Sequence, residues 1–292
     1  MEPLRWANIP TKFDPYNEET DTLIRQSTIG QCQLCEYRVK LEGVEGFLEP
    51  VSEPMVFGTC VHHLIAEDLA VGEPRLDLLS NMNEWVEKIL VEDYAWSLAQ
   101  VPEPQRFFSE VSAAYRQWRT GVYPNLPEPI ALEKEMYLKL GDGVNGGYYL
   151  RGTPDAVFGN QIMDWKTAGR AWKEGKADYS IQASLYMALA KQELDVGIRK
   201  FSFWVFDRAK RVWSRIPTDR TVKEINSALQ TAYDYAYKLE VRAFTASPVV
   251  EEYGKKKRGW YCGVKYCPAW NICPVKYLDD NTDEKAIAVR SW

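Results

Sequence analysis

Apolar and polar positions alternate along two neighbouring runs of the chain, residues 148–158 and 161–167. The Gly-Asn pair at 159–160 separates these runs, and both residue types tolerate the positive φ that a two-residue hairpin turn requires. If the pair forms the loop, the runs are antiparallel strands. Counting back from the turn then places Asp155 directly opposite Asp164.

The same alternation places Lys166 on the strand face that carries Asp164, because side chains two apart share a face. Two carboxylates and an ammonium therefore converge on one patch. Directly opposed like charges destabilise a sheet. A fold that keeps Asp155 opposite Asp164 is expected to hold a cation between them, so the pattern predicts a metal site.

Further strands are predicted on either side of this hairpin. Residues 130–140 alternate and would carry Glu133 and Glu135 on one face, which completes a three-stranded meander. Residues 201–206 and 211–216 also have strand character.

Helical periodicity is clear over residues 58–71, and Gly72 is a typical C-terminal stop. His62 lies on the flank of the apolar stripe of this helix, whereas His63 points nearly opposite to it. We expect His62 to reach inward, either as a hydrogen-bonded residue at the core boundary or as a ligand. The stripe consists of Val61, Leu64, Ile65 and Leu69.

Other helices are expected within residues 75–120, where two are separated near two prolines, and over residues 219–244. A helix over residues 179–194 would present Gln182 and Tyr186 on one face, since they are four apart.

Composition adds limits to this picture. The chain has 292 residues, 46% of them apolar, which supports a substantial core. No run of 18 apolar residues occurs, and the N-terminus lacks a signal-peptide pattern, so we expect a soluble cytoplasmic protein. The net charge of −5 does not indicate a nucleic-acid binder, although basic residues concentrate locally, as at 255–258.

We expect one domain over residues 1–292. Its predicted parts are an N-terminal helical part, a helical insertion, a sheet core, a C-terminal helix with cysteines, and a tail, at residues 27–72, 73–128, 129–217, 218–275 and 276–292.

Four short motifs follow one another in the expected elements. They are Gly58-Thr-x-x-His62, Gly152-x-x-Asp155, Asp164-Trp-Lys166-Thr and Gln182-x-x-x-Tyr186. Each is weak alone, but their order resembles the RecB-like branch of the PD-(D/E)XK nucleases. The resemblance implies an α/β fold with a restriction-endonuclease-like core, in which a central mixed β-sheet is flanked by helices.

The cysteines extend this resemblance to the iron–sulfur members of that branch, the CRISPR-associated RecB-like exonucleases and AddB-type nuclease domains. Those proteins hold a [4Fe-4S] cluster with one cysteine before the core and three after it. Here four residues separate Cys262 from Cys267, whereas the family usually has two residues between the corresponding cysteines. A structural Zn²⁺ therefore stays open as an alternative. The implied ligands are Cys35, Cys262, Cys267 and Cys273, with Cys32 as an alternative to Cys35; Cys60 is expected to be a buried helix residue.

The resemblance also implies how the site works. Lys166 would position the attacking water or stabilise charge on the phosphate, and Gln182 and Tyr186 would order the site and touch the DNA strand. Glu135 would be an accessory acid. The implied ligands of Mg²⁺ or Mn²⁺ are His62, Asp155, Asp164 and the main-chain carbonyl of Trp165.

The function implied is a metal-dependent DNA exonuclease acting on single strands or DNA ends in recombination or repair, in a bacterial, archaeal or phage-infected cell. The alternatives are a structure-specific endonuclease and a non-catalytic subunit that binds DNA or protein. No Gly-x4-Gly-Lys-Ser/Thr loop occurs, so any unwinding would come from a partner. A recombination, helicase or CRISPR-adaptation protein would be such a partner.

Overall fold

The computed structural model describes most of the chain. The described residues are 4–10, 15–41, 51–94, 100–195, 197–198, 200–244, 249–252, 255–258, 262, 267 and 269–273. The chain divides into two compact units. The first unit comprises Met1–Pro50, Tyr137–Gly152 and Val222–Trp292, and the second unit comprises Val51–Met136 and Thr153–Thr221.

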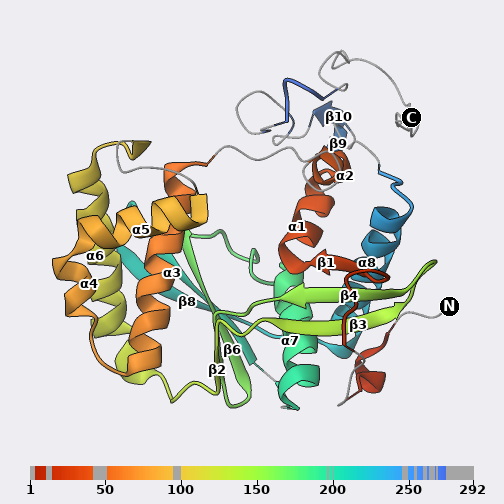
Figure 1. Cartoon of the computed structure of the whole chain (residues 1–292), viewed down its shortest axis with the longest axis horizontal. Helices are drawn as coiled ribbons and strands as arrows, with labels where there is room; N and C mark the ends of the chain where they lie inside the picture. The colour runs from red at the N-terminus through yellow and green to blue at the C-terminus, as the bar shows by residue number, and fades with distance from the viewer. Residues whose placement is uncertain are drawn as a thin grey trace. The chain divides into compact units, whose positions relative to one another are not determined.

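A five-stranded mixed sheet forms the centre of the second unit (Figure 1). Only β6 and β7 are parallel; the other neighbours are antiparallel. Helix α7 (Ile181–Leu194) connects β6 to β7, as a parallel pair requires a crossover. The strands, in sheet order, are β2 (Ala131–Leu132), β5 (Ala156–Phe158), β6 (Gln161–Ala168), β7 (Lys200–Asp207) and β8 (Val212–Thr218).

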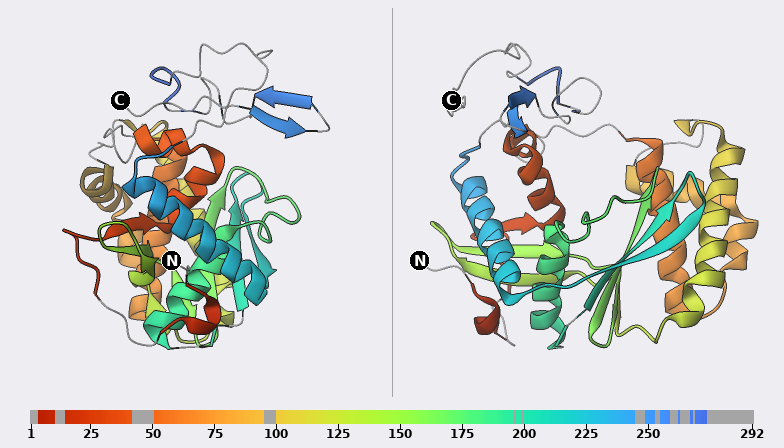
Figure 2. Two further views of the ribbon diagram at one scale, coloured as in Figure 1. Left: turned by 90° about the vertical axis from the view of Figure 1, so that its right-hand side faces the viewer. Right: turned by 180° about the vertical axis from the view of Figure 1, so that it is seen from behind.

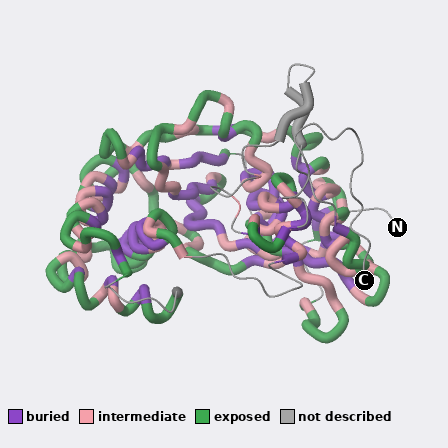
Figure 3. The backbone as a smooth tube through the Cα atoms, turned by 90° about the horizontal axis from the view of Figure 1, so that it is seen from above, coloured by how far each residue is buried: buried purple, intermediate pink, exposed green. Residues whose placement is uncertain are grey.

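Helices cover both faces of this sheet. On one face, α3 and α6 share a core with Met163 and Trp165 of β6. On the other face, Tyr186 of α7 packs against Phe201 of β7. The helices of the first face are α3 (Glu53–Val71), α4 (Leu76–Ser80), α5 (Met82–Tyr94) and α6 (Pro104–Gly121). Figure 3 shows buried positions along the strands and within the helices, with the exposed positions towards the outside.

The predicted stop of α3 is confirmed, because Gly72 has a φ of 76° and its N–H caps the carbonyl of Asp68. The helix begins five residues before the predicted start. Its expected apolar stripe is buried, and so is Cys60, as predicted.

The three-stranded meander prediction is wrong. β2 ends at Leu132, and β3 (Met136–Asp142) belongs to a separate sheet; Glu133 between them has a φ of 43°. Likewise β4 (Gly147–Gly152) and β5 lie in different sheets, with Thr153, Pro154 and Asp155 between them. Proline has no N–H to donate to a ladder, which favours a break at this point.

The first unit contains the second sheet, in the order β1-β4-β3, in which β1 (Thr22–Arg25) is parallel to β4. Helix α8 (Val222–Glu240) packs on β1 and β4 (Figure 2). The first unit also contains the 3-10 helix η1 (Trp6–Asn8) and the helices α1 (Gln26–Leu34) and α2 (Glu36–Val39). Its strands β9 (Val249–Glu252) and β10 (Lys255–Arg258) form an antiparallel pair. The second unit contains the 3-10 helix η4 (Tyr123–Asn125). Among the helices described, none has the length and apolarity needed to cross a bilayer.

Candidate functional site

The β5–β6 hairpin has the register expected from its turn. Phe158 pairs with Gln161 and Ala156 pairs with Met163, so the next position along opposes Asp155 to Asp164. Gly159 adopts a φ of 54° in the turn. Both aspartates are buried, with exposed fractions of 8% for Asp155 and 1% for Asp164.

Two different environments hold these aspartates. Asp155 Oδ2 accepts a hydrogen bond from the main-chain N–H of Trp165 at 2.5 Å. Burial disfavours its ionised form, yet the charge of His62 and then that of Lys166 hold the pKa of Asp155 below its usual value. For Asp164, burial is the main cause that raises the pKa to about 6, and the charge of Asp155 adds to it.

Asp164 has two close polar partners. Lys166 Nζ lies 2.5 Å from its Oδ1, and Gln182 Nε2 donates a hydrogen bond to its Oδ2 at 3.0 Å. Burial disfavours the Lys166 ammonium, but the charges of Asp164 and Asp155 outweigh it and raise the pKa of Lys166. The predicted convergence of two carboxylates and one ammonium is therefore present in the structure.

Tyr186, one turn along α7 from Gln182, has a different partner. Its hydroxyl donates to the main-chain carbonyl of Thr153 at 3.1 Å. This bond fixes the bend that separates β4 from β5, two residues before Asp155. Gln182 thus contacts Asp164 directly, and Tyr186 contacts the backbone two residues before Asp155.

Helix α3 brings His62 to the hairpin. His62 Nδ1 lies 3.4 Å from Asp155 Oδ1. Gly58 permits the approach, because a Cβ at this position would lie 3.1 Å from the Thr167 Oγ1 of β6. Burial disfavours the imidazolium of His62, but the charge and hydrogen bond of Asp155 raise its pKa. His63 points away and lies 3.4 Å from Asp93, as expected for the outer face of the helix.

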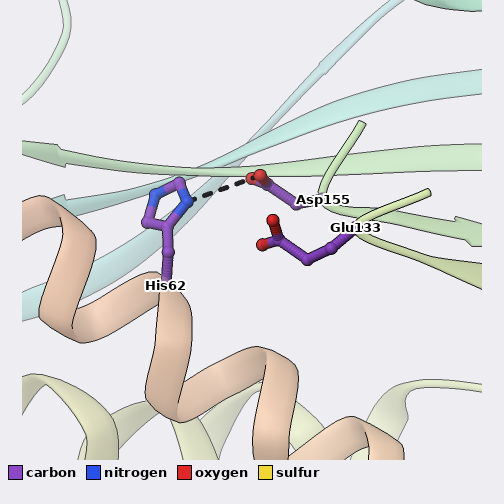
Figure 4. Close-up of side chains that lie close together, drawn as sticks. All are labelled: His62, Glu133 and Asp155. Atoms are coloured by element: carbon purple, nitrogen blue, oxygen red, sulfur yellow. Dashed lines mark ion pairs between the residues drawn. The ribbon is translucent and has the colours of Figure 1, made fainter. Parts of the chain in front are cut away.

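Glu133 is the site residue that the sequence pattern did not single out. Figure 4 shows its carboxylate directed at the space between His62 and Asp155. One ligand atom from each of these three residues lies within 4.8 Å of the others. The Glu133 N–H also donates to the main-chain carbonyl of Asp155 at 3.0 Å.

The surroundings of Glu133 change its acidity. Solvent reaches part of the side chain, yet burial of the carboxyl raises its pKa to about 7, and the charge of Asp155 adds to this effect. Glu135, the acid assigned to the site from sequence, is three residues beyond β2, and the group of potential metal ligands among the described residues contains Glu133 in its place. Alternation placed both glutamates on one face, and no sequence signal marked the chain break that distinguishes them.

A pocket of about 550 Å³ opens beside this group. It follows one side of α3, and its lining includes Gly58, Thr59, His62, His63 and Glu133. An imidazole and two carboxylates suit a divalent cation of the Mg²⁺ or Mn²⁺ type. The donor set and the pocket together could bind such an ion, with further ligands completing its coordination.

The cysteines of the first unit form a separate group. Cys35, Cys267 and Cys273 pack into one cluster with Tyr37, Leu41 and Ala269. Cys32 belongs to another cluster, with Val39 and Phe244, and burial raises its pKa to about 12. Cys262 is partly exposed. Residues from near the two ends of the chain therefore do meet, as expected from the cysteine distribution.

Comparisons with known proteins identify the family. The family model for the PD-(D/E)XK nuclease superfamily matches residues 25–274. No curated protein sequence matches the chain.

Two solved structures align over much of the chain. The crystal structure of SSO0001 covers 91% of this chain and 90% of its own, with 15% identity and a TM-score of 0.39. That of a candidate exonuclease from Eubacterium rectale covers 76% and 82%, with 11% identity and a TM-score of 0.49.

The family match covers well over half of the chain, and the mixed sheets flanked by helices fit a restriction-endonuclease-like fold. Asp155, Asp164 and Lys166 have the types and the spacing that give this superfamily its name. The chain therefore belongs to the PD-(D/E)XK nuclease superfamily.

Proposed function

We propose that this protein is a RecB-like, divalent-metal-dependent DNA exonuclease that acts on single strands or DNA ends. The observation that carries the proposal is the convergence of His62, Glu133 and Asp155 within 4.8 Å, next to the Asp164–Lys166 pair. These residues come from a helix, a chain break and a hairpin, and no packing requirement explains why two acids and a histidine should lie so close together.

In this proposal His62, Glu133 and Asp155 hold Mg²⁺ or Mn²⁺, with Asp164 and the main-chain carbonyl of Trp165 as the further ligands that the family resemblance implies. When bound, the ion supplies Lewis-acid activation of the phosphate and lowers the pKa of the attacking water. Glu133 takes the place of Glu135 as the accessory acid.

The remaining groups act on the phosphate and on one another. The Lys166 ammonium, held 2.5 Å from Asp164, offsets negative charge that develops on the phosphate oxygens. Gln182 orients the Asp164 carboxylate through its 3.0 Å hydrogen bond. Tyr186 fixes the Thr153 carbonyl and so positions Asp155.

The same site argues against a purely structural subunit. A non-catalytic member of the superfamily would be expected to have lost an acid or the lysine, whereas Asp155, Asp164 and Lys166 are all present. A helicase, recombination or CRISPR-adaptation protein would be the partner for any unwinding of a duplex, since no Gly-x4-Gly-Lys-Ser/Thr loop occurs in the sequence.

We further propose that Cys35, Cys262, Cys267 and Cys273 bind a [4Fe-4S] cluster, with Zn²⁺ as the alternative. The packing of Cys35 with Cys267 and Cys273 supports this assignment. It also favours Cys35 over Cys32, because Cys32 packs in a different cluster, with Val39 and Phe244. Purified protein should absorb broadly in the visible range and contain iron; a colourless preparation with stoichiometric zinc would contradict the cluster.

Digestion of end-labelled DNA tests the enzymatic proposal. Linear single-stranded DNA should be degraded with Mg²⁺ or Mn²⁺, and EDTA should stop the reaction. A closed circular single strand of the same sequence should survive if the enzyme needs an end, whereas cutting of the circle would identify an endonuclease. No degradation of any DNA with either metal would contradict the proposed activity.

A further inference from the structure

The segment between β6 and α7 carries an exposed aromatic side chain just before the helix that contains Gln182. Tyr179 is 89% exposed, the highest value among the large apolar side chains in the described part of the chain. The sequence pattern placed it inside the following helix, but α7 begins at Ile181. A single exposed aromatic residue is common on protein surfaces, so its surroundings decide whether it has a role.

The backbone around Tyr179 is held firmly. Arg220 Nη2 donates hydrogen bonds to the main-chain carbonyls of Ala177, at 2.7 Å, and Ser180, at 2.9 Å. Thr218 Oγ1 donates to the Asp178 carboxylate at 2.7 Å. Tyr179 therefore projects from a fixed loop, and a ligand that stacks on its ring would order little additional chain.

Both ends of this loop are tied to the neighbourhood of Asp164. Gln182, three residues after Tyr179, donates a hydrogen bond to the Asp164 carboxylate. At the other end, the Trp172 ring lies 5.0 Å from that of Phe203. Phe203 is the partner of Asp164 in the β6–β7 ladder, and paired residues of neighbouring strands share a sheet face. The loop thus borders the face that carries Asp164 and Lys166.

A cation accompanies the aromatic residues. Lys176 Nζ lies 4.3 Å from the centre of the Trp172 ring, a cation–π contact that positions the exposed ammonium. Burial, and next the charge of Lys166, lower the pKa of Lys176, which is consistent with both amines facing the same region. An aromatic ring and an ammonium on one loop are the two elements that bind bases and phosphates of a single strand.

We propose that Tyr179 and Lys176 form a subsite for single-stranded nucleic acid, in which Tyr179 stacks on a base and Lys176 contacts a neighbouring phosphate. The proposal rests on the nuclease function and adds a specificity to it. Bases within a duplex are already stacked on both faces, so the subsite favours single strands over duplexes.

Binding without cleavage tests the subsite. The probe is a fluorescein-labelled single-stranded DNA of mixed sequence, and the measurement is fluorescence anisotropy in EDTA. Tyr179→Ala should weaken binding about tenfold, the size of one lost base stack, while Tyr179→Trp should keep the wild-type affinity. Lys176→Ala should lower the slope of log K against log salt by about 0.7, as loss of one phosphate contact predicts. Affinity for a blunt duplex should be unchanged by Tyr179→Ala.

The matched control is Tyr237→Ala, because Tyr237 is 47% exposed but belongs to α8 in the other unit. It should leave binding of the single strand unchanged. Thermal melting of Tyr179→Ala should coincide with that of wild type, since the side chain is mostly in solvent. Equal affinity of Tyr179→Ala and wild type for the single strand, or no single-strand binding by wild type, would overturn the subsite.

Failure of the subsite and failure of the proposed nuclease give different results. A wild-type protein that binds single strands through Tyr179 but degrades no DNA would leave the subsite in place and contradict the activity. A protein that degrades single strands with the same KM for wild type and Tyr179→Ala would overturn the subsite alone.

Discussion

Two stretches of the chain have the same alternating pattern and different outcomes. The β5–β6 hairpin formed in the register that its turn predicted, with Ala156 paired with Met163, so that Asp155 and Asp164 occupy the next position along. Residues 130–140, which alternate as well, do not form one strand. They divide into β2 and β3, which belong to different sheets.

The difference shows what alternation does and does not specify. The hairpin is determined by neighbours in sequence, because a glycine with a φ of 54° sets the turn and the turn sets the register. The break at Glu133 arises because β2 and β3 pair with strands of two different sheets, and this pairing depends on distant segments of the chain. That break is also what directs Glu133 towards His62 and Asp155.

Loss of Lys166 should have the largest effect. Lys166→Ala removes the ammonium that offsets charge on the phosphate, so the rate of DNA degradation should fall about a hundredfold to a thousandfold. Initial rates on end-labelled single strands, with circular dichroism to verify the fold, measure the effect. Lys88→Ala, on the exposed side of α5, is the control and should retain full activity. If Lys166→Ala retains activity within threefold of wild type, the proposed role of Lys166 in catalysis is wrong.

Substitution of each glutamate in turn should show whether Glu133, at the chain break, or Glu135, which the strand alternation indicated, binds the metal. Glu133→Gln should weaken Mn²⁺ binding by about tenfold to a hundredfold, as expected when a metal site loses a charged partner. Glu135→Gln is the matched control, since it is the same substitution two residues away. Isothermal titration with Mn²⁺ gives both affinities. If Glu135→Gln has the larger effect, the strand alternation identified the correct acid and the assignment of Glu133 as a metal ligand is wrong.

The turn of the hairpin should show a smaller effect on stability. Gly159→Ala would force a Cβ into a left-handed conformation and should lower the free energy of unfolding by about 1 kcal/mol. Gly121→Ala, at the end of α6 with open space around its Cα, should be neutral or slightly stabilising. Urea denaturation compares the two. Equal stabilities of the two variants would mean that the turn does not control the register.

The smallest effect concerns the approach of α3 to the hairpin. Gly58→Ala would place a Cβ 3.1 Å from Thr167 Oγ1, and a small shift should destabilise the protein by about 0.5 kcal/mol. Adding Thr167→Ala removes the close atom and should restore part of this loss in a double-mutant cycle. Additive effects of the two substitutions would show that Gly58 serves another purpose.

The sequence by itself determined the local parts of this protein. Turn chemistry set the β5–β6 register, helical spacing directed His62 inward and His63 outward, and the four-residue interval placed Gln182 and Tyr186 on one face of α7. These predictions succeeded because each depends on residues within about one turn or one hairpin.

Only the tertiary structure decided which segments share a sheet and which acid faces the histidine. β1 was not anticipated, since four residues become a strand there through parallel pairing with β4, more than a hundred positions away. A backbone bend at Glu133, which no residue type in the sequence indicated, gives Glu133 and Glu135 different surroundings. Pairing between distant segments depends on the entire set of competing contacts, whereas side-chain periodicity records only whether a position faces apolar surroundings.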